Sequence, residues 1–250
     1  GHRAMRCTRD GDAKRLVVEH AEVESTIEFD QLLCAVGRSP RVEGYGLEAL
    51  GIALVEDKKT IATDAWLRTT YPNIYAVGDV AGPFQLTHVA AHQAWYAAVN
   101  ALFGRFKRFK ADYSVIPWAT FTDPEVARVG LSESEAKAQK VAFEVTRFEL
   151  QELDRAVTDG ATQGFVKVLA VPGKDTILGV TIVGEHAGDL LAEYVLAMKH
   201  GLGLNKILGT IHAYPTLSEA SRSVAGAWKR AHAPKRLLAW ARRYHAWERG

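Results

Sequence analysis

The alternation of hydrophobic and polar residues predicts strands in the first quarter of the chain. KRLVVEHAEVEST alternates around a turn, and FDQLLCAVG is a compact apolar run, so residues 14–37 predict strands that end at Gly37. GLEALGIALVEDKKTIATDAW predicts a short helix, a turn at Glu56–Lys59 and a strand. NIYAVGDV predicts one more strand after the breaker pair Tyr71-Pro72.

The rest of the chain combines helices with alternating strands. An alanine-rich segment with helical periodicity runs from Thr87 to Phe103. Beyond Ser114 four segments alternate as strands, namely WATFTDPEVARVG, FEVTRFEL, GFVKVLAV and ILGVTIVG. DLLAEYVLAMKHGLG predicts a helix that ends in glycine. Together these elements predict an α+β fold, with an antiparallel sheet and helices in the second half.

Composition narrows the class of protein. The chain has 250 residues, of which 48% are hydrophobic and 24% charged, as in ordinary globular proteins. A net charge of +2 gives no reason to expect a nucleic-acid partner. The apolar runs are shorter than the roughly 20 residues of a membrane span, and no signal peptide opens the chain. Cys7 and Cys34 form no C-x-x-C pair or zinc pattern, so we expect no metal site, no disulfide and a cytoplasmic location.

Two glycine-containing segments are candidates for nucleotide chemistry. Residues 44–49, GYGLEA, match the dinucleotide fingerprint, but a turn-rich segment precedes them, so we interpret them as a loop entering a helix. Gly78-Asp79 lies at the end of a predicted strand and shortly before the helix that starts at Thr87. A carboxylate there can bind ribose or ribityl hydroxyls, and the helix start favours an anion. The alternative is that Asp79 only caps a turn.

Four segments resemble, in order, the flavoprotein pyridine nucleotide-disulfide oxidoreductases, a family that includes dihydrolipoamide dehydrogenase, glutathione reductase and mercuric reductase. T-x(10)-IYAVGDV is similar to the family's second FAD-binding motif. LLCAVGRSP resembles the segment that closes the NAD(P)-binding domain. FTDPEVARVGLSESEA and YPTLSEA resemble the start and the end of the dimerisation domain.

The resemblance implies a role for each matching position. Asp79, next to Gly78, would bind the ribityl chain of FAD, and Gly37 would lie beside NAD(P)H. Four residues at the helix start would place backbone groups near the flavin: Gln85, Leu86, Thr87 and His88. The resemblance also implies domains: a remnant of the NAD(P)-binding domain (1–42), the end of the FAD-binding domain (43–112) and a dimerisation domain (113–225) that pairs two copies. A basic tail (226–250) extends beyond the short ends typical of the family.

One departure from the family concerns the proton-transfer residue. Disulfide-reducing members read H-P-T-x-S-E, where the histidine exchanges protons with thiols and the glutamate orients it. Here the matching residues are Tyr214 and Glu219. A phenol has a pKa near 10 and an imidazole one near 6.5, so Tyr214 can donate a proton but is a poor base at neutral pH. His212 is the alternative base, although in an extended segment it would lie about 6–7 Å away.

This departure changes the expected acceptor. The substitution argues against efficient reduction of a disulfide. It favours a small-molecule acceptor that needs less proton transfer, such as a quinone, an electron carrier or a metal ion. Mercuric reductases also lack the histidine but carry a C-terminal cysteine pair, whereas this chain ends in WERG.

The family's N-terminal G-x-G-x-x-G and C-x(4)-C motifs are not in this sequence. We therefore expect the C-terminal part of a FAD-dependent enzyme that is inactive alone. The alternative is a stand-alone dimerisation module without catalytic activity.

The tail has an amphipathic pattern. AWKRAHAPKRLLAWARRYHAWERG contains seven Lys/Arg and one Glu, and its large apolar residues fall on one helical face: Leu237, Trp240, Ala241, Tyr244 and Trp247. We interpret this face as packed on the protein's own dimer. Contact with an anionic membrane surface is the less favoured alternative.

Overall fold

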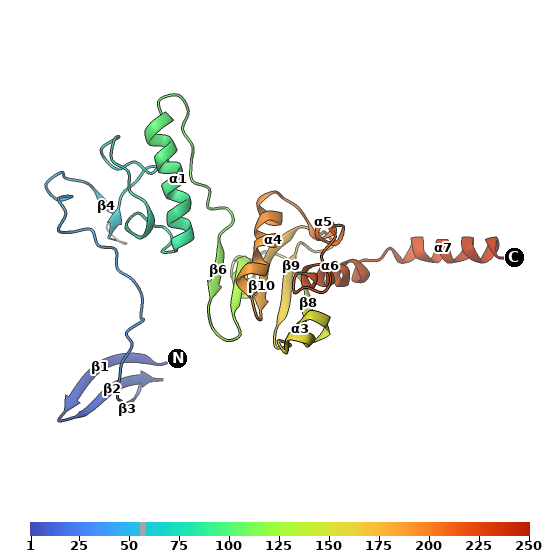
Figure 1. The fold of residues 1–250 in the computed structure, drawn as a ribbon, viewed down its shortest axis with the longest axis horizontal. Helices are drawn as coiled ribbons and strands as arrows, with labels where there is room; N and C mark the ends of the chain where they lie inside the picture. Colours follow the sequence, from blue (N-terminus) through green and yellow to red (C-terminus); the bar gives the residue numbers. More distant parts are fainter. Residues whose placement is uncertain (56–58) are drawn as a thin grey trace. The chain divides into compact units, whose positions relative to one another are not determined.

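The computed structural model describes residues 1–55 and 59–250, which form two compact units, residues 1–109 and 110–250 (Figure 1). Most of the turn expected at Glu56–Lys59 therefore lies outside the described residues. Mixed helices and antiparallel sheets confirm the predicted fold class.

The first unit begins with a three-stranded antiparallel sheet in the order β1-β2-β3. Its strands are β1 (Arg3–Asp10), β2 (Ala13–His20) and β3 (Val23–Phe29). Ala21 and Glu22 link β2 to β3 with φ of 48° and 65°, a pair of left-handed residues that suits a tight hairpin. The β2–β3 hairpin was expected, whereas β1 was not.

The strand predicted up to Gly37 is wrong in its second half. β3 ends at Phe29, and residues 31–35 form no regular structure. Leu33 and Val36 are 89% and 88% exposed. An apolar run becomes a strand only where neighbouring strands pair with it, and none does so in the described part of this chain. Cys7 and Cys34 are both exposed and unpaired, so neither is a buried structural thiol.

The remainder of the first unit contains little regular structure before its helix. β4 (Leu54–Val55) and β5 (Thr60–Ile61) form a two-stranded ladder, followed by the 3-10 turn η1 (Gly78–Val80) and helix α1 (Thr87–Phe103). A small core holds these pieces together: Val42, Ile52, Ile61 and Ala76. Helix α1 has the predicted bounds.

Two other elements predicted in this region are wrong. Residues 47–51 form turns, not a short helix, and Gly51 has a φ of 62°. The segment 73–80 makes one isolated bridge, Arg68 with Tyr75, in place of a strand. A buried strand of a parallel sheet is stabilised by its neighbours, so the apolar pattern alone does not produce it.

The second unit contains a five-stranded antiparallel sheet in the order β6-β7-β10-β9-β8. Its strands confirm the four alternating segments: β6 (Pro117–Thr120), β7 (Val126–Gly130), β8 (Glu144–Glu149), β9 (Phe165–Ala170) and β10 (Ile177–Val183). Alternate residues such as Val166, Val168 and Ile182 are at most 1% exposed. One face of the sheet therefore forms the core.

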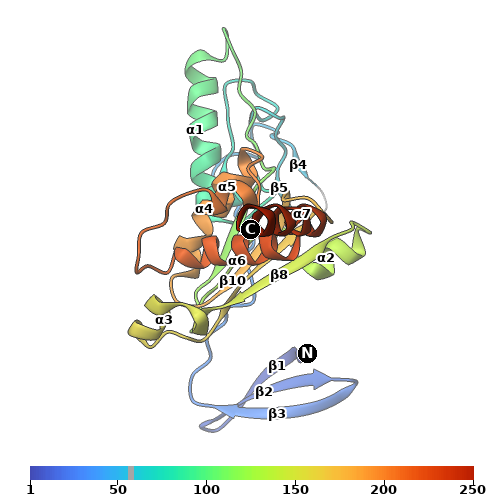
Figure 2. The ribbon, with the colours of Figure 1, turned by 90° about the vertical axis from the view of Figure 1, so that its right-hand side faces the viewer.

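Helices cover that apolar face (Figure 2). α4 (Ala187–Lys199) packs on β6, β7 and β10, and α6 (Glu219–Ala231) packs on β8 and β9. Shorter helices complete the layer: η2 (Leu150–Glu152), α3 (Asp154–Asp159) and α5 (Leu204–Leu208). A last helix, α7 (Lys235–Glu248), follows α6. In the described part of the chain, no helix is both long and apolar enough to cross a bilayer.

The polar face of the sheet is tied to helix α2 (Glu133–Ala138) by ion pairs. Arg128 Nη1 lies 2.7 Å from Glu135 Oε2, and Lys167 Nζ lies 2.8 Å from Glu133 Oε1. Glu135 also completes a capping box with Ser132. The hydrogen bond from Arg128, followed by those from Ser132, lowers the pKa of Glu135 to about 2.

Glu135→Gln is expected to make the free energy of unfolding depend less on pH in the acid range. Because folding lowers the pKa of Glu135, its contribution is complete above the ordinary value of 4.5 and is lost as the pH falls toward about 2. The Glu135 side chain is 39% exposed. Solvent screening therefore limits the effect to below about 1 kcal/mol. Between pH 7 and pH 3, the melting temperature of Glu135→Gln should fall by less than that of wild type. Exposed Glu152→Gln is the control. An equal fall in melting temperature in both variants would contradict the stabilising role of Glu135.

Candidate functional site

A buried glutamine fixes the loop that follows Ala76. Gln93 of α1 is fully buried, and its Oε1 accepts a 2.6 Å hydrogen bond from the backbone N–H of Gly78. Its Nε2 donates to the Gly82 carbonyl at 2.7 Å. Gly78 has a φ of 75°, and a Cβ there would lie 3.1 Å from the Ala90 Cβ. Glycine at 78 therefore lets the loop approach α1 in a conformation that other residues avoid.

The structure brings three of the expected cofactor residues to the same place, around Arg38. Arg38 Nη1 lies 3.9 Å from Asp79 Oδ2, and the Arg38 carbonyl accepts a 3.4 Å hydrogen bond from Gln85 Nε2. Gly37, the residue before Arg38, has a φ of 138°. The Asp79 side chain is 36% exposed, so its carboxylate is open to a ligand.

The start of α1 has the features of a site for an electron-rich group. Leu86 is the N-cap residue and supplies no side-chain cap to the helix. Thr87 and His88 open the first turn, which contains no acidic residue. The positive end of a 17-residue helix dipole is thus not neutralised by the first turn itself.

In the second unit, Tyr214 lies in the loop before α6 and is 71% exposed. Its hydroxyl donates a 3.0 Å hydrogen bond to Oδ2 of Asp154, the first residue of α3. That hydrogen bond, together with the charge of Asp154, raises the pKa of Tyr214 above its ordinary value of 10.0. At neutral pH the phenol therefore keeps its proton and acts as a donor.

His212 points away from this position. Its Nε2 lies 2.9 Å from Glu193 Oε1 on α4, and its Nδ1 lies 3.0 Å from the Thr210 carbonyl. The His212 side chain is only 6% exposed, in contrast to the exposed Tyr214. Both ring nitrogens already have an oxygen partner, so the geometry supports a structural role for His212.

Glu219 shapes the loop that carries Tyr214. Its Oε2 accepts a 3.4 Å hydrogen bond from the Thr216 backbone N–H. Thr216 Oγ1 donates to the Ala213 carbonyl at 2.6 Å and lies 2.8 Å from Ser218 Oγ. These bonds close the loop in front of α6, and the charge of Glu219 adds to the raised pKa of Tyr214.

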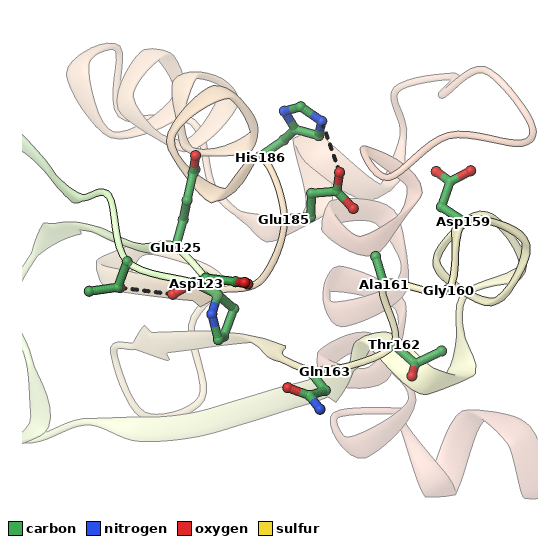
Figure 3. A pocket seen from close by; sticks show the side chains of 11 residues that line it. Asp123, Glu125, Asp159, Gly160, Ala161, Thr162, Gln163, Glu185 and His186 are labelled. Carbon is green, nitrogen blue, oxygen red and sulfur yellow. Dashed lines mark hydrogen bonds and ion pairs between the residues drawn. The ribbon is translucent and has the colours of Figure 1, made fainter.

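A separate acidic hollow of about 570 Å³ lies between the β6–β7 turn, the end of α3 and the start of α4 (Figure 3). Four carboxylates and one histidine line it: Asp123, Glu125, Asp159, Glu185 and His186. Glu125 accepts a 3.2 Å hydrogen bond from the Gly188 N–H, which caps α4, and Glu185 faces the His186 ring in Figure 3. No group of three acidic, histidine or cysteine side chains in the described residues is arranged to hold a metal ion.

Sequence reasoning missed Arg38, Gln93 and Asp154. A signal for Gln93 exists, because Val89, Gln93, Ala97 and Asn100 are the buried residues of α1 and follow helical spacing. A polar residue within such a stripe indicates a buried hydrogen-bonding role. Asp154 lies 60 residues from Tyr214, and no local pattern connects the two.

Family models match most of the chain. The model described as pyridine nucleotide-disulphide oxidoreductase matches residues 2–94, and the model of that family's dimerisation domain matches residues 116–225. The chain belongs to the pyridine nucleotide-disulphide oxidoreductase family, and the predicted resemblance is confirmed. Members of this family use FAD and NAD(P)H, so the expected cofactors are confirmed at the level of the family.

Individual relatives are dihydrolipoyl dehydrogenases. The chain is 41% identical to the Chlamydia trachomatis enzyme over 209 residues, which cover 84% of this chain and 43% of that enzyme. It is 38% identical to the Thermus scotoductus enzyme over 229 residues, which cover 91% of this chain and 49% of that enzyme. The chain thus spans less than half the length of these relatives.

Solved structures share the fold of most of the chain. The Cu(II) complex of RclA, a HOCl-induced flavoprotein disulfide reductase from Escherichia coli, superposes with a TM-score of 0.80 at 25% identity, covering 90% of this chain and 49% of that one. LpdA from Mycobacterium tuberculosis superposes with a TM-score of 0.79 at 28% identity, covering 90% of this chain and 48% of that one.

Proposed function

We propose that this chain is the C-terminal portion of a FAD-dependent NAD(P)H oxidoreductase that forms a homodimer through residues 113–225 and reduces an acceptor other than a disulfide. The observation that carries the proposal is the Tyr214 hydroxyl held by Asp154. It stands where disulfide-reducing members of the family have a histidine.

The first unit offers residues that fit the flavin. The Asp79 carboxylate is suited to bind ribityl hydroxyls, and the start of α1 at Thr87 is suited to stabilise negative charge on a reduced ring. Gly37 would leave room for the nicotinamide nucleotide. The flavin supplies the hydride and electron chemistry, and the protein positions it. Gln93 fixes the loop that carries Asp79, so it acts as a positioning residue.

The second unit supports the choice of acceptor. Thiol–disulfide exchange needs a group that takes up and returns a proton near neutral pH. Tyr214 keeps its proton there, and His212 is bound to Glu193 and Thr210. A quinone fits this arrangement, because a phenol can donate a hydrogen bond to its carbonyl oxygen. A metal ion is a further candidate acceptor, because the structurally similar RclA forms a complex with Cu(II).

The second candidate is a dimerisation module without catalysis. Residues 127–228 contain a complete hydrophobic core of their own, which favours an independently folded unit. The two candidates differ in what precedes Gly1 in the gene.

Reading the coding sequence upstream of Gly1 separates them. We expect the reading frame to continue into G-x-G-x-x-G and C-x(4)-C segments, and the protein expressed from the whole frame to show a stoichiometric flavin absorbance band. A stop codon followed by a start signal directly before Gly1, with a colourless product, would support the module instead.

A further inference from the structure

Helix α7 presents a large apolar face that the rest of the second unit does not cover. Leu237, Trp240 and Trp247 are 58%, 63% and 78% exposed. Large exposed aromatic residues on one helix indicate an interaction surface. Its 14 residues span about 21 Å at 1.5 Å per residue.

The aromatic residues of α7 form a continuous strip. The rings of Trp240 and Tyr244 stack with centroids 5.8 Å apart, and the Tyr244 and Trp247 rings are 6.3 Å apart. With Leu237 they fall at positions i, i+3, i+7 and i+10, which lie on one side of a helix. Tryptophan and tyrosine are the residues that prefer the boundary between water and hydrocarbon.

The charges around this strip are almost all positive. Residues 229–249 contain seven Lys/Arg and the single acidic residue Glu248. Glu248 Oε1 accepts a 3.1 Å hydrogen bond from Tyr244, and its Oε2 lies 3.0 Å from His245 Nδ1. The one carboxylate side chain is thus engaged within the helix, so the exposed arginines favour an anionic partner.

We propose that α7 lies flat in the headgroup layer of an anionic lipid membrane, with Trp240, Tyr244 and Trp247 facing the acyl boundary. Charge complementarity selects this partner. Two copies of α7 packed face to face would bring two clusters of arginines together, and like charges repel. An anionic bilayer supplies both the negative charge and the apolar layer that a basic amphipathic helix needs. By helical spacing Arg243 lies on a flank of the strip, where it can reach lipid headgroups, and Arg242 lies on the opposite side of the helix.

Co-sedimentation of the 250-residue chain with vesicles tests the proposal. Binding to vesicles that combine phosphatidylcholine with phosphatidylglycerol should be strong, and binding to pure phosphatidylcholine should be weak. Arg242→Ser with Arg243→Ser should weaken binding about fivefold or more, with Arg243 accounting for most of the change because it lies nearer the headgroups. Trp240→Ala with Trp247→Ala should weaken binding more than about tenfold, because each tryptophan buries a large apolar area.

Two controls match these changes outside α7. Trp95→Ala removes another exposed tryptophan, and Lys107→Ser with Arg108→Ser removes two positive charges from the segment that follows α1. Both should change binding less than about twofold. Equal binding of wild type and the tryptophan double variant would overturn the proposal. So would a lower mass of that double variant in sedimentation equilibrium, which would show that α7 covers a second copy of the chain.

Discussion

Tyr214→His is expected to raise the rate of lipoamide reduction about a hundredfold in the complete flavoenzyme. The phenol holds its proton at neutral pH because its ordinary pKa is 10.0, and the hydrogen bond to Asp154 raises that pKa further. An imidazole at the same position titrates near pH 6.5, and a well-placed general base contributes about 10²–10⁴ to the rate. Asp154 and Glu219 supply the carboxylates that would hold the new ring.

Tyr214→Phe is the matched control for this prediction. It removes the hydroxyl and keeps the ring, so lipoamide reduction should not rise, and the rate with a quinone should fall by no more than about the tenfold that one hydrogen bond supplies. Flavin absorbance and dimer mass must be unchanged in both variants. A Tyr214→His enzyme that retains flavin and still fails to reduce lipoamide faster would show that another residue limits the acceptor.

Gln93→Ala is expected to destabilise the loop at Gly78 by about 3 kcal/mol, because two buried backbone groups lose their partners at about 1–3 kcal/mol each. Gln93 is fully buried and bonds both Gly78 and Gly82. Hydrogen exchange of peptides covering residues 74–103 should accelerate about a hundredfold, since 1.4 kcal/mol corresponds to a factor of ten.

Peptides from the five-stranded sheet give an internal reference for that experiment, because the sheet belongs to the other compact unit. Gln85→Ala is the control within the same unit. Its side chain is exposed and makes only a long 3.4 Å bond to Arg38, so exchange should change less than about threefold. Similar acceleration in both variants would mean that Gln93 does not fix the loop.

The elements with a strong pattern of their own were predicted from the sequence. Helix α1 begins at Thr87 and ends before Gly104, as its alanine-rich periodicity predicts. The strands of the five-stranded sheet pair antiparallel with one another, so each has its partners within the chain. The strands predicted up to Gly37 and at residues 73–80 were wrong, because strand formation depends on neighbouring strands that the apolar pattern does not reveal.

The candidate site was predictable only in part. Family motifs predicted Asp79, Gln85 and Tyr214 as site residues. The structure adds their contacts with Arg38 and Asp154. The bond between Tyr214 and Asp154 joins two loops that are distant in sequence, so only the folded chain reveals it. Gln93 could have been identified from the sequence as a polar residue at a buried position of α1, but a search for apolar residues alone overlooks it.

The measurement that tests the central claim most directly is the ratio of kcat/KM for a benzoquinone to kcat/KM for lipoamide in the unmodified complete enzyme at neutral pH. Our account predicts a ratio well above one, because Tyr214 donates a hydrogen bond but does not accept a proton there. A ratio below one would show that thiol proton transfer proceeds without a histidine at position 214, and it would contradict the proposed acceptor.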